Sequence, residues 1–420
     1  MALMPSGTIT SQLNQIQFAG EFDEFNLRGM LTTIYRLKGQ GYDKVDLSFA
    51  RLTHAKAPQM LPFAIYCRNL LHQGFEVRIE LPDDSKLKRL FQNTNWAYLI
   101  DPRSYEPSDF HAATNMPACL FTDPSAQFQT VDKAVNLLLA TLKITDRKQV
   151  EAIEWSVNEI ADNVLSHSSS AVGGVMQVTS RLDKNMVEFV IADAGVGIPK
   201  TLREAHSYYT SDVHALQEAI KEGVTRNSAT NMGNGLFGTF RLAELSGGRF
   251  GIYSGRASLK SMGAGRGTHI KDEKIPFSGS VVECSINLGN PELLSEALTF
   301  RGKKHSPFSN LDRIDESEKI TIKLVDEAMS FGSRIAARPV KSKIVNLLTN
   351  TGAKIEIDLE GVTLITSSFA DEVFGKVFVE LGPLTFMNRV VLLSGSKIVR
   401  QLIDRAISQR VAVGLGQDQA

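Results

Sequence analysis

The sequence predicts an α/β protein in which strands alternate with helices. With 420 residues the chain is long enough for about two or three domains. Short alternating apolar segments follow helical segments near both ends of the chain, as in layered α/β folds. We therefore expect three blocks joined by one linker, with these limits: 1–122, 123–295, 296–317 for the linker, and 318–420.

Composition limits the kinds of partner. The formal net charge is zero, so we expect neither a nucleic-acid nor an anionic membrane partner bound through bulk charge. Cys67, Cys119 and Cys284 are few, odd in number and far apart, which argues against a disulfide framework or a zinc site. The first residues lack the charged and apolar regions of a signal peptide, so we expect none, and no stretch approaches the roughly 20 apolar residues of a membrane span. We expect a cytoplasmic protein.

In each of the two outer blocks, the sequence predicts alternating strands and helices. In the first block we expect strands at Lys44–Phe49 and Phe75–Glu80 and helices at Pro58–Leu71 and Asp83–Phe91. The polar stretch Arg301–Ser317 reads as a linker. After it we expect strands at Ile320–Leu324, Lys354–Leu359 and Val390–Leu393 and a helix at Ser396–Val411.

The outer blocks also resemble one another. Matching positions occur in one register: Val45-Asp46-Leu47 with Ile357-Asp358-Leu359, Leu52 with Leu364, and Ser85-Lys86-Leu87 with Ser396-Lys397-Ile398. These matches predict an internal duplication with the central block between the copies. The alternative is that any two segments of this class match so well by chance.

The central block opens with an amphipathic helix over Val150–His167. Apolar residues recur along it at steps of three and four, and Glu159 and Asn163 lie one turn apart beside that apolar face. The amide oxygen of Asn163 can complete a Mg²⁺ shell with phosphate oxygens, and the Glu159 carboxylate can deprotonate a nucleophile. The alternative is a solvated polar helix face.

Two glycine-rich segments follow. The strand Met186–Ala192 runs into Asp193-Ala194-Gly195-Val196-Gly197, where a carboxylate beside a tight turn can accept a hydrogen bond from an exocyclic amine. Gly233, Gly235 and Gly238 then precede a predicted helix, Thr239–Ser246, and such a helix start suits phosphates. The polar segment Pro199–Gly233 between them predicts a lid. Strands are expected at Arg249–Ser254 and Val281–Asn287.

In order, Glu159-x-x-x-Asn163, Asp193-x-Gly195-x-Gly197 and Gly233-x-Gly235-Leu236 resemble the three nucleotide motifs of the gyrase, HSP90, histidine kinase and MutL (GHKL) ATPases. The resemblance implies a Bergerat-type mixed sheet covered by helices, with ATP and Mg²⁺ as cofactors. It assigns Mg²⁺ to Asn163, the adenine amine to Asp193, the phosphates to Gly233 and Gly235, and the general base to Glu159. Gly195, Gly197, Leu236 and Gly238 complete the implied nucleotide site.

The sequence departs from this family in two places. A Gly-Thr pair often holds the adenine end, and here Gly279-Ser280 is best placed, with Gly267-Thr268 as a second candidate; Ser280 is therefore included in the site. The third motif is one residue wider, as Gly235-Leu236-Phe237-Gly238. None of His72, His111 and His206 is followed by an acidic residue, so we do not expect a sensor histidine kinase. The resemblance favours the anti-sigma-factor and serine-kinase branch.

The third block resembles STAS-like domains related to anti-sigma-factor antagonists, through Asp358–Val362 and Ile365–Glu372. The resemblance implies a phosphorylated serine at Ser367 or Ser368, although antagonists usually have Asp-Ser-Ser/Thr-Gly there. The alternative is that Ser367 or Ser368 simply caps a helix. In the first block Ala55 and Lys56 fall at the matching place, which predicts a degenerate STAS-like domain.

Three functions remain open. The first is an ATP-dependent regulatory switch with slow hydrolysis, coupled to the STAS-like domains and through them to a protein partner or a second copy in a homodimer. The second is an enzyme of the anti-sigma type, a serine kinase acting on Ser367, Ser368 or a partner. The third is a protein that binds ATP without turnover, in which Glu159→Gln leaves activity intact.

Overall fold

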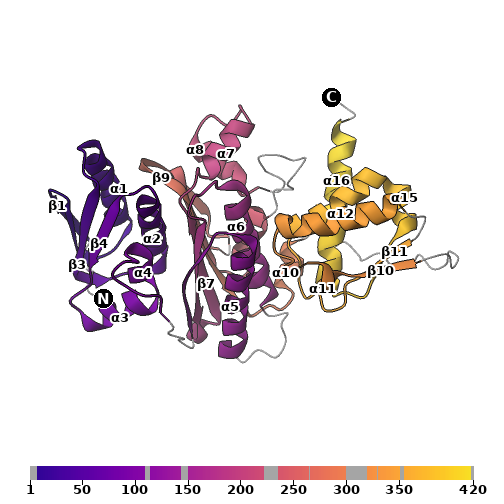
Figure 1. The fold of residues 1–420 in the computed structure, drawn as a ribbon, viewed down its shortest axis with the longest axis horizontal. Coiled ribbons are helices and arrows are strands. Elements are labelled where there is room, and N and C mark those ends of the chain that lie inside the picture. The colour runs from indigo at the N-terminus through magenta and orange to yellow at the C-terminus, as the bar shows by residue number, and fades with distance from the viewer. Residues whose placement is uncertain are drawn as a thin grey trace.

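The computed structural model describes residues 7–108, 114–142, 150–221, 235–263, 265–298, 319–328, 330–350 and 354–417. Its strands form three separate sheets, one each in an N-terminal, a central and a C-terminal domain (Figure 1). The two outer domains lie on opposite sides of the central one (Figure 1). Within the described ranges, no helix has the length and apolar character needed to cross a membrane.

The N-terminal domain is a four-stranded sheet in the order β1-β2-β3-β4. The β1–β2 pair is antiparallel, and β2–β3 and β3–β4 are parallel. The α1–α4 helices accompany this sheet. The elements are β1 (Thr8–Gln12), β2 (Gln15–Glu21), α1 (Glu24–Gly39), β3 (Lys44–His54), α2 (Ala57–His72), β4 (Glu76–Glu80), α3 (Ser85–Asn93) and α4 (Trp96–Ile100).

The central domain is a five-stranded sheet in the order β5-β6-β7-β9-β8. The resemblance implied a mixed sheet, but all four described pairings are antiparallel, because β6–β7 and β8–β9 are consecutive strands that short turns can join. The elements are β5 (Asn115–Phe121), α5 (Pro124–Leu142), α6 (Glu151–His167), β6 (Gly174–Arg181), η2 (Leu182–Lys184), β7 (Met186–Asp193), α7 (Ile198–Ala205), α8 (Asp212–Ala219), α9 (Gly235–Leu245), β8 (Arg249–Ser261), β9 (Thr268–Asn287) and α10 (Leu293–Ala297). β5 precedes residue 122 and yet belongs to this sheet.

The C-terminal domain has a parallel three-stranded sheet in the order β10-β11-β12. Its second crossover contains one helical stretch made of α13, a π-helical turn η3 and α14, and then the separate helix α15. The elements are β10 (Lys319–Lys323), α11 (Leu324–Glu327), α12 (Arg334–Asn350), β11 (Lys354–Asp358), α13 (Ser367–Ala370), η3 (Asp371–Gly375), α14 (Lys376–Leu381), α15 (Pro383–Arg389), β12 (Val390–Leu393) and α16 (Lys397–Gln417).

The outer domains share an order of elements. In each, a strand, a long helix, a middle strand, a second helix, a third strand and a further helix follow one another, and the middle strand pairs in parallel with both neighbours. This order agrees with the predicted duplication, which stays a prediction. The N-terminal domain adds the β1 hairpin strand.

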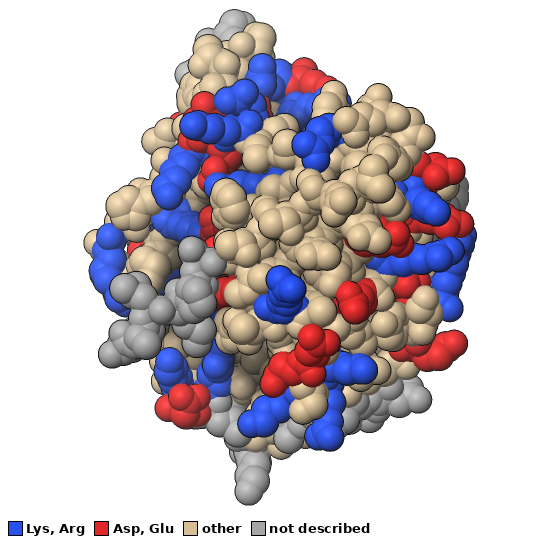
Figure 2. Space-filling model, turned by 90° about the vertical axis from the view of Figure 1, so that its left-hand side faces the viewer, with Lys and Arg blue, Asp and Glu red and all other residues tan. Residues whose placement is uncertain are grey.

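The N-terminal domain covers one face of the central sheet. Helix α2 packs on β6 and β7, and one apolar cluster joins the N-terminal core to Val175, Val190 and Ala192 of that face. Polar contacts add to it: Trp96 Nε1 donates to Gln177 at 2.9 Å, and Arg28 binds Glu273 at 2.7 Å. On the outward side of this domain, basic and acidic residues are interspersed around a largely uncharged centre (Figure 2).

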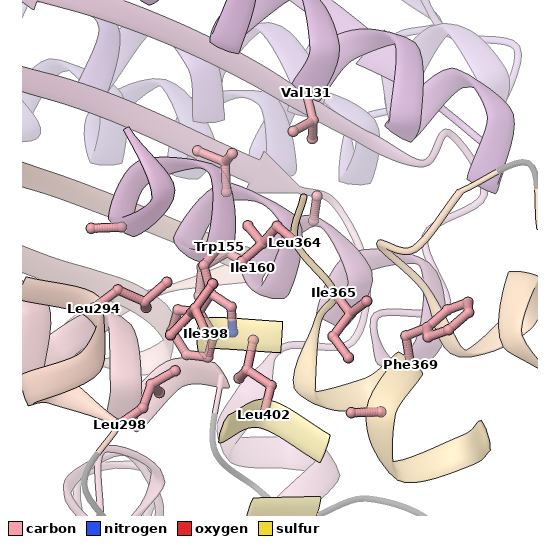
Figure 3. Close-up of a cluster of buried hydrophobic side chains, with 14 of the residues drawn as sticks. Val131, Trp155, Ile160, Leu294, Leu298, Leu364, Ile365, Phe369, Ile398 and Leu402 are labelled. Atoms are coloured by element: carbon pink, nitrogen blue, oxygen red, sulfur yellow. The ribbon is translucent and has the colours of Figure 1, made fainter. Parts of the chain in front are cut away.

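The C-terminal domain docks on the helical side of the central domain. Trp155 and Ile160 of α6 and the α10 leucines meet apolar residues from the α13 and α16 regions in one buried cluster (Figure 3). The labelled members are Val131, Trp155, Ile160, Leu294, Leu298, Leu364, Ile365, Phe369, Ile398 and Leu402. Helix α6 is thus buried both toward the sheet and toward the C-terminal domain.

Some boundaries differ from expectation. The predicted helix Thr239–Ser246 begins earlier, at Gly235, so Gly235, Leu236 and Gly238 lie in a helix rather than in a loop. The predicted lid contains two helices, α7 and α8. The expected linker Arg301–Ser317 and the loop residue Gly233 lie outside the described residues.

Candidate functional site

Asp193 ends β7 at the edge of the central sheet. Its side chain is buried, and Oδ1 accepts a hydrogen bond from the Gly195 N–H at 2.8 Å. Burial raises the pKa of Asp193 to about 7, and the Gly195 N–H offsets part of this effect. Position 195 requires glycine, because a Cβ there would lie 2.0 Å from the Ser168 carbonyl oxygen.

Ser280 is the serine beside Asp193. The two residues are paired across β7 and β9, whereas Thr268, the second candidate, pairs with Ser261 at the other end of β9. Ser254 of β8 links β9 to the start of α7. Its hydroxyl donates to the Gly279 carbonyl at 2.7 Å and accepts from the Ile198 N–H at 2.9 Å. Gly197 has a φ of +85°, which permits the turn that leads into α7.

Glu159 and Asn163 lie on the same side of helix α6. Glu159 is 3% exposed, while Asn163, one turn later, is half-buried. Burial raises the pKa of Glu159 to about 7. The sequence did not single out Asp162, which is also buried and whose pKa burial raises to about 6.

Helix α9 approaches α6 through its glycines. A Cβ at Gly235 would lie 2.6 Å from Glu159 Oε2, and one at Gly238 would lie 2.3 Å from the Trp155 ring. The start of α9 therefore lies directly against the predicted base. Leu236 instead packs on a small cluster of α7 and α8 that contains Leu202 and Tyr209.

The helix start at Ser367 meets this site from the C-terminal domain. The Ser367 N–H donates to Glu159 Oε1 at 2.5 Å. The Ser368 hydroxyl and the Arg334 backbone N–H lie against Asp162 and lower its pKa, but less than burial raises it. The structure thus places Ser367 beside the predicted base and Ser368 beside Asp162, although more than two hundred residues separate α6 from these serines in sequence.

The capping alternative is wrong in its choice of residue. Thr366 is the N-cap of α13, and its hydroxyl accepts from the Phe369 N–H at 3.2 Å. The Ser367 hydroxyl is buried and has no hydrogen-bond partner in the described part of the chain. It lies close enough to Glu159 to lower the pKa of that carboxyl slightly.

Charged residues of the C-terminal domain surround the helix starts. Arg334 Nη1 binds both Asp371 and Glu372 at 2.9 Å, and Arg410 binds Asp371 at 2.6 Å. Lys376 donates to Glu372 at 2.5 Å. All but Lys376, whose side chain is 20% exposed, are largely buried, and the acidic pair lies in the π-helical turn η3, a feature frequent at functional sites.

Known families match two parts of the chain. Residues 149–278 match the histidine kinase-, DNA gyrase B- and HSP90-like ATPases, so the central domain is a GHKL ATPase domain, a class that binds ATP. Residues 336–399 match a STAS-like domain of unknown function, so the C-terminal domain is STAS-like. No curated protein matches the chain.

The residues present fit an ATP·Mg²⁺ complex of the kind that GHKL ATPases bind. Among the described residues no group of three or more His, Cys, Asp and Glu side chains could hold a metal by itself. A Mg²⁺ ion would therefore depend on Asn163 and on phosphate oxygens, as this hard ion accepts. Asp193 and Ser280 would hold the adenine end, and the start of α9 would face the phosphates.

Three residues of this arrangement escaped the sequence reasoning. Asp162 carried a weak signal, because it lies three residues after Glu159 on the same helix. Ser254 and Arg334 gave no signal in the sequence. The β8–β9 pairing brings Ser254 beside Ser280, and domain docking brings Arg334 to α6.

Proposed function

We propose that the protein is an ATP-dependent switch in which the nucleotide site and the docked C-terminal domain control one another. The observation that carries this proposal is the hydrogen bond from the Ser367 N–H to Glu159. A general base must reach the proton that it removes. Glu159 is instead buried in the domain interface with one oxygen occupied, so the docked protein would hydrolyse ATP slowly or not at all.

Trp155 supports coupling between the two sites. Its ring contacts Gly238 near the start of α9 and lies in the apolar cluster shared with the C-terminal domain (Figure 3). Bound ATP would supply phosphate oxygens and, with Mg²⁺, positive charge at Asn163. A shift of α9 on nucleotide binding would change the contact between Gly238 and Trp155 and so disturb the docking surface. The released domain would then be free to bind a protein partner or a second copy.

Small-angle scattering with and without Mg·ATP tests the switch. We expect the wild-type radius of gyration to increase with ATP, because the C-terminal domain is released. Asn163→Ala should abolish the increase, while Asn136→Ala, an exposed residue of α5, should leave it intact. Identical scattering profiles for the wild type with and without ATP would reject the switch.

A second function, a serine kinase of the anti-sigma type, is favoured by the buried and unpartnered Ser367 hydroxyl beside Glu159. In this reaction the Ser367 oxygen would attack the γ-phosphorus of ATP and the bond to the β–γ bridging oxygen would break. Glu159 would take the hydroxyl proton, and ADP would leave. Ser368 is the alternative acceptor.

Incubation with γ-labelled ATP tests this second function. The label should appear on the chain, and Ser367→Ala combined with Ser368→Ala should remove it, whereas exposed Thr363→Ala should not. Glu159→Gln should slow labelling strongly. An unlabelled wild-type chain, with phosphate release also unaffected by Glu159→Gln, would leave the third function, ATP binding without turnover.

A further inference from the structure

Three polar side chains lie in one row on the helical face of the central sheet. Asp193 ends β7, Ser280 pairs with it on β9, and Ser254 pairs with Ser280 on β8. Side chains of a strand alternate between its two faces, so residues two positions apart share a face. The residues two positions from this row belong to the buried cluster on the helical side: Ile191, Val282 and Ile252.

The hydroxyl of Ser254 has every hydrogen-bonding position occupied. It is fully buried, it accepts from the Ile198 N–H at 2.9 Å, and it lies 2.7 Å from the Gly279 carbonyl oxygen and 3.0 Å from Ser280 Oγ. A serine hydroxyl has one proton to donate and two lone pairs that accept. A carbonyl oxygen can only accept, so the Ser254 proton goes to Gly279. The Ser280 hydroxyl must therefore donate its own proton to Ser254.

The backbone holds the two groups that orient the Ser254 hydroxyl. Gly279 has a φ of +120°, and a Cβ there would lie 2.0 Å from the Asp193 carbonyl oxygen, so this position requires glycine. The β8–β9 register is irregular next to Ser254, and such irregularities often redirect groups beside a functional site. Neither the Gly279 carbonyl nor the Ile198 N–H can rotate as a side chain does. The direction of the Ser254 proton is therefore set by the fold.

The consequence for Ser280 is that it meets a ligand only as an acceptor, because its single proton is committed to Ser254. Its neighbour Asp193 is also an acceptor when ionised, and it already receives the backbone N–H groups of Gly195 and Ser280. Two acceptors thus lie side by side at this end of the sheet. An exocyclic amine has two N–H groups to donate, whereas a carbonyl oxygen in its place would face another acceptor.

We propose that Ser254 is a positioning residue that takes the proton of Ser280 and so makes the site select an amino-purine over an oxo-purine. Ser254 acts through Ser280 and does not itself contact the base. Without Ser254 the Ser280 hydroxyl could turn and donate to an oxo group. The inference rests on the ATP site of the proposed function, but on neither hydrolysis nor release of the C-terminal domain.

Calorimetric titration with Mg·ATP and with Mg·inosine triphosphate tests the inference. The two ligands carry the same phosphates and ribose, but inosine has an oxygen in place of the adenine amine. Wild-type protein should bind ATP more tightly, and Ser254→Ala should lower the affinity ratio about fivefold, the effect of one hydrogen bond. A general loss of stability in the variant lowers both affinities and cancels in the ratio. An unchanged ratio in Ser254→Ala would overturn the inference.

A double variant separates positioning from a structural role. Ser280→Ala should lower the ratio by itself, and adding Ser254→Ala to it should lower the ratio no further, because the residue through which Ser254 acts is gone. An equal further fall in the Ser280→Ala background would show that Ser254 acts by another route. Ser180→Ala is the matched control, since it removes a buried hydroxyl of β6 that has no partner in the described part of the chain.

Scattering keeps this inference apart from the proposed switch. Ser254→Ala saturated with Mg·ATP should still show the increase in radius of gyration expected of the wild type. An unchanged ratio together with that increase would overturn the role of Ser254 and leave the switch standing. The predicted ratios without any increase, in the wild type as well, would reject the switch and support the role of Ser254.

Discussion

At the residue scale, Asp193 and Glu159 share a raised pKa but face different neighbours. Burial raises the pKa of each carboxyl to about 7. Asp193 accepts hydrogen bonds from the backbone N–H groups of Gly195 and Ser280, both within the central domain. Glu159 receives a hydrogen bond from another domain. The two groups should therefore titrate with different consequences, one for nucleotide affinity and one for docking.

For Asp193 we predict that nucleotide affinity rises with pH. The carboxyl keeps its proton up to about pH 7 rather than its usual 3.8, and only the ionised form is a full acceptor for the adenine amine. ATP affinity should increase as the pH rises to about 7 and level off above it. Calorimetric titrations of wild-type and Asp193→Asn protein measure this, and the difference between them cancels the titration of ATP itself.

Asp193→Asn should also bind ATP at least about tenfold more weakly at neutral pH, since a charge-assisted hydrogen bond is lost. Asp183→Asn in the exposed turn η2 is the control. Equal pH profiles in the wild type and in Asp193→Asn would show that Asp193 does not contact the nucleotide.

For Glu159 we predict that docking weakens with rising pH. The docked carboxyl has a pKa of about 7 and the exposed one about its usual 4.5, so the docked state holds the proton more tightly. Docking is then strongest below about pH 4.5 and declines until about pH 7, with Asp162 contributing in the same direction up to about pH 6.

A Trp96→Phe variant keeps Trp155 as its only tryptophan, and the emission of Trp155 reports whether the C-terminal domain covers it. The docking equilibrium should be at least about tenfold weaker at about pH 8 than at about pH 5. Glu159→Gln should flatten most of the change, because the amide keeps an acceptor oxygen for the Ser367 N–H but does not titrate. A steep profile retained in Glu159→Gln would assign the pH dependence to other groups.

The sequence predicted three polar members of the candidate nucleotide site but not the buried Asp162 beside them. Glu159, Asn163 and Asp193 carry local signals, because helical spacing and a strand end can be read from neighbouring residues. The resemblance predicted a phosphorylated serine at Ser367 or Ser368, yet the place of Ser367 beside Glu159 depends on docking across more than two hundred residues. Hydrophobic periodicity cannot predict such a contact, because it depends only on residues that are close in sequence.

At the element scale, α6 and α9 approach each other closely at the predicted phosphate end of the site. Two glycines on α9 allow this approach, at Gly235 against Glu159 and at Gly238 against Trp155. The sequence predicted these glycines as a loop because glycine disfavours helix interiors. The gain in packing against α6 overrides that propensity, and the helix begins four residues before the predicted start.

We predict that Gly238→Ala weakens ATP binding and destabilises the central domain by ~1–3 kcal/mol, the usual cost of overpacking. The new methyl group would meet the Trp155 ring at 2.3 Å and push α9 away from α6. Thermal denaturation and nucleotide titration measure the two effects. Gly39→Ala is the matched control, because that helical position in α1 has open space and its melting temperature should not fall.

At the scale of the whole molecule, the central domain is covered from both sides. The N-terminal domain covers one face of the central sheet, and the C-terminal domain covers α6 on the helical side (Figure 1). Both interfaces contain an apolar cluster, but their polar contacts differ. The N-terminal interface adds pairs such as Arg28–Glu273, whereas the C-terminal interface places buried carboxylates against helix starts. We therefore expect the N-terminal domain to stay attached when the C-terminal domain is released.

Arg28→Ala tests the N-terminal attachment. It would leave Glu273, with a side chain only 7% exposed, without its cation, and Ser258 alone would remain as a donor. Breaking a largely buried pair in this way costs ~2–4 kcal/mol, so thermal denaturation should show a melting temperature several degrees lower. Arg36→Ala on the same helix removes only an exposed contact to Ser11 and should have little effect.

The sequence by itself determined the α/β class, the strands and helices with clear periodicity, and the ordered motifs of an ATP-binding domain followed by a STAS-like domain. These features depend on neighbouring residues, and their physical causes act locally. The tertiary structure alone decided that β5 joins the central sheet, that Ser280 rather than Thr268 lies beside Asp193, and that Ser367 meets Glu159. Each of these contacts brings together residues far apart in the chain, and burial of apolar surface between whole elements determines which of them meet.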